Sequence, residues 1–282
     1  MKLSAWLTAA NKHRLTRILK VETASPTVKT FTFRDKLCAK ATPGQFLMLW
    51  IPGVDEIPLS VYSVDVGKAT VSVAVKRVGE ATRALHSLKV GDWVGVRGPF
   101  GNSFTIKGGK VLLVGGGVGI APLTFLAREL TAKNVSKILV VVGAKTREEL
   151  IFLDVLEKFC GKGNVLAATE DGSYGVKGLA STLAESAMAG EKFDVVYTCG
   201  PEPMTRAVLD RAERFNVYAE ASLERIMRCA IGICGSCTIG RYRVCKDGPV
   251  FNINQLKGVK DEFGVWKRDF NGRRTPFQRD IH

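Results

Sequence analysis

The hydrophobic and polar positions of the chain follow three successive patterns, and the first of them predicts strands. Between residues 14 and 105, apolar or β-branched residues alternate with polar ones in short segments bounded by Gly, Pro and Asp. Several short strands separated by turn residues predict a small antiparallel β-barrel. The pattern is clearest in TVKTFTFR, QFLMLWIP, ATVSVAVKRV and DWVGVRGPF.

The second pattern begins at Lys110, where longer apolar runs alternate with amphipathic segments. KVLLVGGG predicts a buried strand that runs into a glycine turn, and IAPLTFLARELTAK predicts the helix after it. Alternating strands and helices predict a doubly wound parallel sheet. The alternation continues through KILVVVGAKT, REELIFLDVLEKF, NVLAATED, a helical stretch near STLAESAMA, and FDVVYTCG.

The third pattern begins near residue 221 and is rich in glycine and cysteine. SLERIMRCAIGICGSCTIGRYRVCKDGPVFN lacks the apolar periodicity of a self-sufficient core, so we expect a metal centre to organise it. The tail, VWKRDFNGRRTPFQRDIH, is polar and basic. We therefore predict a multidomain fold of all-β and α/β units. Its parts are an antiparallel barrel over residues 10–105, a doubly wound parallel-sheet domain over 106–220, and a small C-terminal domain with its tail over 221–282.

The composition is ordinary for a soluble protein, but the charge is strongly basic. Of 282 residues, 46% are hydrophobic and 24% are charged, which suits two or three compact units. The formal net charge is +14. The cations are scattered and form no RNA- or DNA-binding motif, so we expect no nucleic-acid partner. The charge indicates either a solvated surface or steering toward an acidic protein partner and dinucleotide phosphates.

The pattern of the chain also bears on its location. The first residues, MKLSAWLTAANKHRLTRILKV, carry a short apolar run without a small-residue cleavage site, so we do not expect a secretory signal. No apolar run reaches about 18 residues, so we expect no membrane span. We take a cytoplasmic location as the expectation.

Four of the seven cysteines lie within 17 residues. An odd number of cysteines in a chain expected in the cytoplasm argues against a disulfide framework, and the clustering indicates a metal site. The spacing is C-x4-C-x2-C-x7-C, and C-x4-C-x2-C…C is the plant-type ferredoxin spacing for a 2Fe-2S cluster. The candidate ligands are Cys229, Cys234, Cys237 and Cys245.

The residues around these cysteines fit the same chemistry. Gly232 and Gly235 allow tight turns that bring backbone N–H groups toward the sulfurs, and such hydrogen bonds help to set a cluster's reduction potential. Arg228, Arg241 and Lys246 offer positive charge nearby. A structural zinc site and unligated cysteines are the alternatives. Zinc sites favour two short C-x2-C pairs, whereas only one is present here.

A glycine-rich turn joins the strand KVLLV to the helix that follows it. It reads G-x-G-x-x-P, formed by Gly117, Gly119 and Pro122, rather than G-x-G-x-x-G. Glycines let the backbone approach a pyrophosphate, and a helix N-terminus offers unpaired N–H groups. We predict a dinucleotide site at Gly116, Gly117, Gly119 and Pro122. A purely structural turn is the alternative.

A second element of this site is TCGPEPM, residues 198–204, which ends another predicted strand. Ligands of open α/β sheets bind beyond the carboxyl ends of the strands. We therefore expect Cys199, Gly200 and Pro201 to face the same crevice as the glycine turn. For Cys199 the alternative is a small buried apolar residue.

Together these motifs resemble one family: the electron-transfer subunit of class 1B dihydroorotate dehydrogenase, a relative of the ferredoxin–NADP reductases. The resemblance covers most of the chain, and the cysteine motif is its most specific part. The order of motifs also fits a flavin barrel, a nicotinamide domain and an iron–sulfur domain. The matching segments are PGQFLMLWIPG with DEIPLS, KRVGEATRAL with GDWVGVRGPFGNSF, VLLVGGGVGIAPL, TEDGSYGVKG, YTCGPEPM, and MRCAIGICGSC with YRVCKDGPVF.

The resemblance implies FAD bound mainly by the barrel. The family's Arg-Pro-Ile-Ser motif corresponds to Ile57, Pro58, Leu59 and Ser60, so the arginine that pairs with the flavin phosphates is replaced by isoleucine. A barrel that has lost its flavin is the alternative. Further flavin contacts are implied at Ala74, Val75, Lys76, Ala81 and Thr82. Candidates to replace the lost charge are Lys76, Arg77 and Arg83, and an alternative register places Tyr62 and Ser63 on the flavin.

The resemblance further implies a path of electrons and a partner. FAD links NAD(H), which exchanges a hydride, to a 2Fe-2S cluster on the four cysteines, which accepts single electrons. The implied partner is an FMN-containing catalytic subunit that oxidises dihydroorotate in pyrimidine biosynthesis, in a heterotetramer of two plus two. Hydride and electron transfer depend on positioning, so we name no catalytic acid or base, and we expect His86 to be structural.

Three alternatives stay open. The alternatives to the implied subunit are an electron-transfer subunit of a sulfide dehydrogenase, of a ferredoxin:NADP reductase complex or of a hydrogenase, and a non-catalytic regulatory module. NAD and NADP are not distinguished, because Lys145, Thr146 and Arg147 follow the second parallel strand without an acidic residue at its tip. FAD and FMN are not distinguished either, given Ile57.

Overall fold

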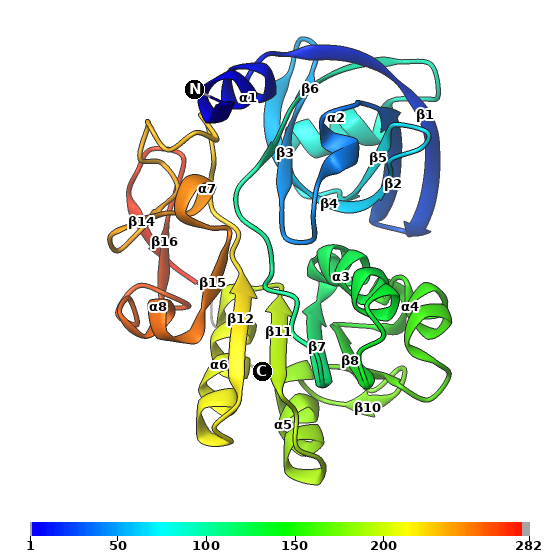
Figure 1. Cartoon of the computed structure of the whole chain (residues 1–282), viewed down its shortest axis with the longest axis vertical. Coiled ribbons are helices and arrows are strands. Elements are labelled where there is room, and N and C mark those ends of the chain that lie inside the picture. The colour runs from blue at the N-terminus through cyan, green and yellow to red at the C-terminus, as the bar shows by residue number, and fades with distance from the viewer. Residues whose placement is uncertain (1, 278–282) are drawn as a thin grey trace.

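The structure is a computed structural model that describes residues 2–277. Figure 1 shows three units: a barrel at the top, an α/β sheet below it, and a C-terminal unit beside both. A short helix, α1 (Lys2–Ala10), lies between the barrel and the C-terminal unit. Among the described residues, no helix combines the length and apolar character needed to cross a bilayer.

The predicted antiparallel barrel is confirmed, and it closes in the strand order β1-β2-β5-β4-β3-β6. Its interior is filled by alternate side chains, including Phe31, Phe33, Leu47 and Val73. Helix α2 (Glu80–Ser87) packs Leu85 into the same core. The strands are β1 (Arg14–Ser25), β2 (Val28–Arg34), β3 (Phe46–Ile51), β4 (Asp55–Asp65), β5 (Thr70–Lys76) and β6 (Trp93–Phe100), and a 3-10 helix spans Cys38–Lys40.

Strand β3 is apolar on both faces, which explains why FLMLWI does not alternate. Leu47 and Leu49 point into the barrel, whereas Phe46 and Met48 belong to a second core outside it. Successive side chains of a strand point to opposite faces, so a strand buried on both sides needs a continuous apolar run. The outer face of β3 therefore packs against the core that the barrel shares with the other two units.

The predicted doubly wound sheet is confirmed, with seven strands in the order β10-β9-β8-β7-β11-β12-β15. Side chains of α3 and α4 share one core with the sheet, and side chains of α5 and α6 share the other. The strands are β7 (Lys110–Gly116), β8 (Lys137–Ala144), β9 (Val165–Thr169), β10 (Val176–Lys177), β11 (Val195–Cys199), β12 (Tyr218–Ser222) and β15 (Val250–Asn252). The helices are α3 (Ile120–Ala132), α4 (Leu153–Cys160), α5 (Ala180–Gly190) and α6 (Glu202–Arg214), with 3-10 helices at Gly117–Gly119 and Arg147–Glu149.

Two details of this sheet differ from the sequence pattern. REELIFLDVLEKF predicts one helix, but Phe152 has a left-handed φ of 63°, so α4 starts only at Leu153. The last strand, β15, pairs antiparallel with β12, although it follows the cysteine-rich segment. The sheet therefore takes its edge strand from beyond the expected boundary at residue 220.

The apolar residues of the C-terminal unit belong to the same core as one face of the sheet. Ile239 and Val244 are fully buried in the same cluster as Val196 of β11 and Met48 of β3. Part of the polar tail forms a hairpin, while residues 278–282 lie outside the described part. The elements are β13 (Thr238–Ile239), β14 (Tyr242–Arg243), α7 (Val244–Asp247), α8 (Ile253–Lys257), β16 (Trp266–Arg268) and β17 (Arg274–Pro276).

A buried ion pair fastens the C-terminal unit to the sheet. The Arg225 guanidinium lies 2.7 Å from the Glu202 carboxylate, and both side chains are almost fully buried, at 3% and 2% exposure. Glu202 starts α6, directly after the predicted TCGP motif, and also accepts a hydrogen bond from the Gly264 N–H at 3.1 Å. Arg225 lies four residues before the first candidate cluster ligand.

Replacing Arg225 by methionine should lower the free energy of unfolding by about 3 kcal/mol, because the Glu202 carboxylate would remain buried without its counter-charge. The matched control is Lys20→Met. Lys20 pairs with Glu22 at the surface, so the change should stay within about 1 kcal/mol of wild type. Urea unfolding followed by circular dichroism measures both, and equal effects of the two variants would contradict the assigned role of the buried pair.

Candidate functional site

The four candidate cluster ligands lie in one small region of the C-terminal unit. Cys229, Cys234 and Cys237 belong to the loop between β12 and β13, and Cys245 lies on α7. Gly232 and Gly235 have φ values of 79° and 73°, the left-handed conformation predicted for tight turns in this loop. The sequence-predicted set is therefore brought together by a single loop and one helical turn.

Backbone N–H groups point at the sulfurs. The Gly232 N–H donates to Cys245 Sγ at 3.2 Å, and the Ile233 N–H donates to Cys229 Sγ at 3.3 Å. The Cys245 N–H donates to Cys237 Sγ at 3.4 Å. N–H groups directed at sulfur stabilise a thiolate and tune the potential of a cluster bound through it.

Hydrogen bonds lower the pKa of two of the four candidate ligands, Cys229 and Cys237. Burial would raise the pKa of the Cys229 thiol, but backbone N–H groups of the loop bring it down to about 7. A hydrogen bond from the Cys245 thiol lowers the pKa of Cys237 to about 7 and raises that of Cys245. In contrast, burial raises the pKa of Cys160 to about 12. Burial also raises the pKa of Cys38 and Cys199.

The cysteines lie two by two, because the Cys234 N–H donates to Cys229 Sγ at 3.5 Å, as the Cys245 N–H does to Cys237 Sγ. Two pairs of thiolates suit a 2Fe-2S cluster, which has two irons and four cysteine ligands. The four-cysteine donor set therefore fits the predicted cluster.

One side of this centre reaches the surface. Cys234 is exposed, and the neighbouring Ile233 is 77% exposed, whereas Cys237 and Cys245 are buried. A shallow cleft beside Cys234 is walled by the β16–β17 hairpin, whose Phe270 is 69% exposed. A cluster held here would have one accessible edge.

The predicted flavin residues lie together on neighbouring strands of the barrel. The register that pairs Val61 of β4 with Val73 of β5 continues toward Ser60 and Ala74. Ile57 and Leu59 turn toward the barrel core, so Pro58 and Ser60 occupy the outer face by alternation. Val75 is buried in the barrel core, and Lys76 reaches across to Glu149 of the α/β unit at 3.2 Å.

Helix α2 supplies the other predicted flavin contacts. Gly79 precedes the helix and provides no side-chain cap, so the first N–H groups of α2 are open to an anion. The Thr82 hydroxyl accepts hydrogen bonds from the Val78 and Gly79 N–H groups, at 2.9 Å each. Ala81 packs against the barrel. These features fit a flavin phosphate at the start of α2, with Arg77 and Arg83 exposed beside it.

The glycine turn and the TCGP segment meet at the ends of adjacent strands β7 and β11, as predicted. A Cβ on Gly119 would lie 2.6 Å from the Gly200 backbone, and a Cβ on Gly200 would lie 2.9 Å from the Gly116 nitrogen, so both positions require glycine. Gly117 has a φ of 54° and faces open space, and Pro201 is exposed. The other predicted residues of this site are buried, so they support the two segments from the interior. They are Gly116, Gly119, Pro122, Cys199 and Gly200.

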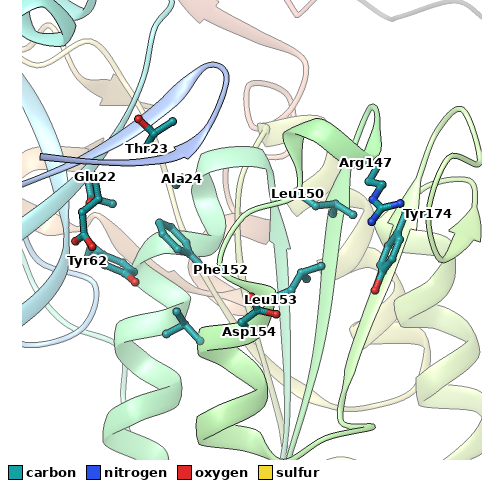
Figure 2. Close-up of a pocket in the computed structure, with 12 residues that line it drawn as sticks. Glu22, Thr23, Ala24, Tyr62, Arg147, Leu150, Phe152, Leu153, Asp154 and Tyr174 are labelled. Carbon is teal, nitrogen blue, oxygen red and sulfur yellow. The ribbon is translucent and has the colours of Figure 1, made fainter.

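A cleft of about 510 Å³ separates the barrel from this sheet. Figure 2 shows Tyr62 of β4 facing Phe152 on one side, and Arg147 beside Tyr174 on the other. The rings of Tyr62 and Phe152 stack with centroids 4.4 Å apart. Tyr62 belongs to the alternative register considered for the flavin. The cleft lies between β4, which carries predicted flavin residues and which we call the flavin strand, and the carboxyl ends of β8 and β9.

Sequence reasoning missed the groups that connect these sites. Arg97 of β6 contacts both the flavin strand, through Glu56, and the loop between β12 and β13 that carries Cys229, which we call the cluster loop. Phe152 and Tyr174 line the cleft. Their partners lie far away in sequence, 132 positions for Arg97 and Cys229, so no local pattern marks them.

Replacing Cys234 by serine should remove the cluster, because serine lacks the thiolate ligand. Iron content should fall well below two per chain, and the absorbance between 400 and 500 nm should drop to that of flavin alone. The matched control is Cys160→Ser, which should keep both, since burial raises the pKa of that thiol to about 12. Full retention of iron in the Cys234 variant would contradict the ligand assignment.

Family models match all three units of the chain. Residues 16–104 match an oxidoreductase FAD-binding domain, and residues 113–210 match an oxidoreductase NAD-binding domain. Residues 224–257 match the iron–sulfur cluster binding domain of dihydroorotate dehydrogenase B. FAD, NAD and an iron–sulfur cluster are therefore the groups for which these domains are built.

Solved structures share this architecture. The chain of an NADH-dependent reduced ferredoxin-NADP oxidoreductase superimposes with a TM-score of 0.79 and 31% identity, covering 88% of this chain and 92% of that one. The ferredoxin reductase of carbazole 1,9a-dioxygenase gives a TM-score of 0.65 at 21% identity, covering 73% of this chain and 66% of that one, and shows the fold alone.

Curated relatives match nearly the whole chain. A probable dihydroorotate dehydrogenase B (NAD(+)) electron transfer subunit of Methanocaldococcus jannaschii is 44% identical over 92% of this chain and 96% of its own length. The corresponding subunit of Pyrococcus furiosus is 42% identical over 88% and 93%. On this evidence, the chain belongs to the family of dihydroorotate dehydrogenase B electron transfer subunits.

Proposed function

We propose that this chain passes electrons between NAD and the FMN of a catalytic subunit that oxidises dihydroorotate. The observation that carries the proposal is the cluster loop, which matches the dihydroorotate dehydrogenase B domain and holds two thiol pairs at a partly exposed edge. In the overall reaction, dihydroorotate loses two electrons and two protons. NAD⁺ gains a hydride, and one proton is released.

The residues of this chain act by positioning. A bound flavin exchanges two electrons with a nicotinamide and single electrons with an iron–sulfur cluster. Pro58 and Ser60 on the outer face of β4, with Ala74 on β5, would hold its ring system. The open N–H groups at the start of α2 would hold its phosphates. Arg77 and Arg83 take over the charge that Ile57 lacks, because Lys76 already pairs with Glu149.

The nicotinamide dinucleotide would bind across the carboxyl ends of the sheet. Gly117 and Pro201 form its exposed floor, and the start of α3 faces the pyrophosphate. The guanidinium of Arg147 lies over the ring of Tyr174 at 5.5 Å, where an adenosine could rest. We propose NAD rather than NADP, because Glu148 has both Asp171 and Arg147 as charged neighbours, and the two carboxylates would repel a 2′-phosphate.

The exposed side of the cluster loop, at Ile233 and Cys234, would be the exit toward the partner. We propose a heterotetramer of two plus two in the cytoplasm. The matched relatives support a catalytic partner, because they are named as subunits of one enzyme. A second candidate is an electron-transfer subunit of a ferredoxin:NADP reductase complex, which the 31% identity to the solved reductase chain favours.

Co-expression with a catalytic dihydroorotate dehydrogenase subunit tests the function. The two chains should co-purify with FAD, FMN and two irons per chain described here, and should reduce NAD⁺ when dihydroorotate is added. The Cys234→Ser variant should lose at least about 100-fold of this activity. Sedimentation of the complex measures the stoichiometry. Co-purification with ferredoxin-dependent reductase subunits alone, without dihydroorotate oxidation, would favour the second candidate.

The coenzyme preference is a separate prediction. With a dye as electron acceptor, kcat/KM for NADH should exceed that for NADPH by at least about tenfold, since like charges oppose the 2′-phosphate. Replacing Glu148 and Asp171 by alanine should narrow this ratio. The control is Asp210→Ala on α6, across the sheet, which should leave it unchanged. A preference for NADPH in the wild type would overturn the assignment.

A further inference from the structure

We propose that Arg97 is a positioning residue that fixes the cluster loop against the flavin strand and makes the cluster easier to reduce. The inference rests on the proposed electron path. It concerns a buried cation that touches no predicted site residue except through the backbone of Cys229. The contacts of Arg97, its burial and the edge of the guanidinium that each partner occupies carry the argument.

Arg97 lies in the middle of β6, and its side chain is on the outer face of the barrel because the preceding Val96 belongs to the barrel core. Its neighbour across β3 is Met48, which packs in the core shared by all three units. Only 7% of Arg97 is exposed. A guanidinium buried to this degree must be compensated by hydrogen bonds and counter-charge, so its partners indicate what it holds together.

The partners come from three separate parts of the chain. Nε and Nη2 donate to the two carboxylate oxygens of Glu56 on β4, at 2.8 and 2.6 Å. Nη1 donates to the Asn11 side chain in the turn after α1, and lies 3.4 Å from the Cys229 carbonyl oxygen. The planar guanidinium thus presents one edge to Glu56 and another to the cluster loop.

Both ends of this link lead directly to a predicted redox group. Glu56 precedes Ile57 and shares the outer face of β4 with Pro58 and Ser60, by the alternation of side chains. Cys229 is the first cluster ligand, and its thiol accepts hydrogen bonds from the loop. Arg97 therefore joins the strand expected to hold the flavin to the residue expected to hold an iron. Such a rigid link sets the separation across which an electron must pass.

The charge of Arg97 has a second consequence. A thiolate-ligated 2Fe-2S cluster is negative and gains a further negative charge on reduction, so a nearby buried cation favours the reduced form. The guanidinium stands between Glu56 and Cys229, and the carboxylate acts in the opposite sense from behind it. Arg228 and Lys246 also lie along the loop, but solvent and salt screen exposed charges more strongly.

The test is the midpoint potential of the cluster in the purified chain without its partner, followed by electron paramagnetic resonance. In Arg97→Gln, the ratio of reduced to oxidised cluster at the wild-type midpoint should fall about tenfold, which is about 59 mV for one electron. In Glu56→Gln, which keeps the guanidinium but removes the carboxylate charge, the ratio should rise several-fold. Opposite signs are expected for an electrostatic role. Shifts of the same sign, or none, would overturn it.

Two further variants separate charge from packing. Arg14 forms a comparable two-pronged contact with Asp35 at the barrel, at 2.7 and 3.1 Å, and Arg14→Gln should leave the potential unchanged. Arg97→Lys retains the charge without the fork and should hold the potential near wild type. In stopped-flow reduction by NADH, Arg97→Lys should slow cluster bleaching several-fold while flavin reduction keeps its rate. An unchanged bleaching rate would remove the positioning role.

These outcomes are independent of the proposed partner. The potentials and single-turnover rates are measured on the isolated chain, so a failure to co-purify with a dihydroorotate-oxidising subunit affects only the proposed function. If the cluster stays intact and its potential and bleaching rate are the same in the Arg97 and Glu56 variants as in the wild type, only the proposed role of Arg97 is refuted.

Discussion

One apolar core runs through all three units, and the relative placement of the redox groups depends on it. Phe46 and Met48 come from the barrel, Val196 from the sheet, and Val244 from the C-terminal unit, and all are buried in the same cluster. Protein interiors are packed as densely as organic crystals. The units are therefore fixed in register with one another, as electron transfer between separately bound cofactors requires.

Two buried arginines link the units around this core, and each is paired with a carboxylate. Arg97 joins the barrel to the cluster loop, and Arg225 joins the sheet to the segment leading into that loop. Each guanidinium is matched by a carboxylate, Glu56 or Glu202. A buried ion pair adds little net stability compared with apolar packing, but an unmatched charge is costly, so such pairs specify one arrangement of the units over others.

The architecture could be predicted because it depends on short-range patterns, and the four candidate ligands were proposed from a short-range pattern of the same kind. Alternation marked the barrel, strand–helix repetition marked the sheet, and spacing marked the four cysteines. The break at Phe152 depends on a backbone conformation that an aromatic residue rarely adopts. The antiparallel edge strand and the contacts of Arg97 depend on pairs of residues far apart in the chain, and neither leaves a local signal. Helix α6 was not among the predicted elements, although it begins directly after the TCGP motif.

The edge strand β15 has a consequence for how the protein is made. Residues 250–252 follow the last cysteine, Cys245, and pair with β12. A nascent chain that has emerged only as far as β12 thus presents an unpaired sheet edge, the kind of surface on which chains aggregate. That edge is covered only after all four cysteines have been synthesised. The sheet and the set of cluster ligands are therefore completed at nearly the same time during biosynthesis. A truncation before residue 250 would leave the edge of β12 unpaired, and we expect it to lower the solubility of the protein and to disrupt the cluster site.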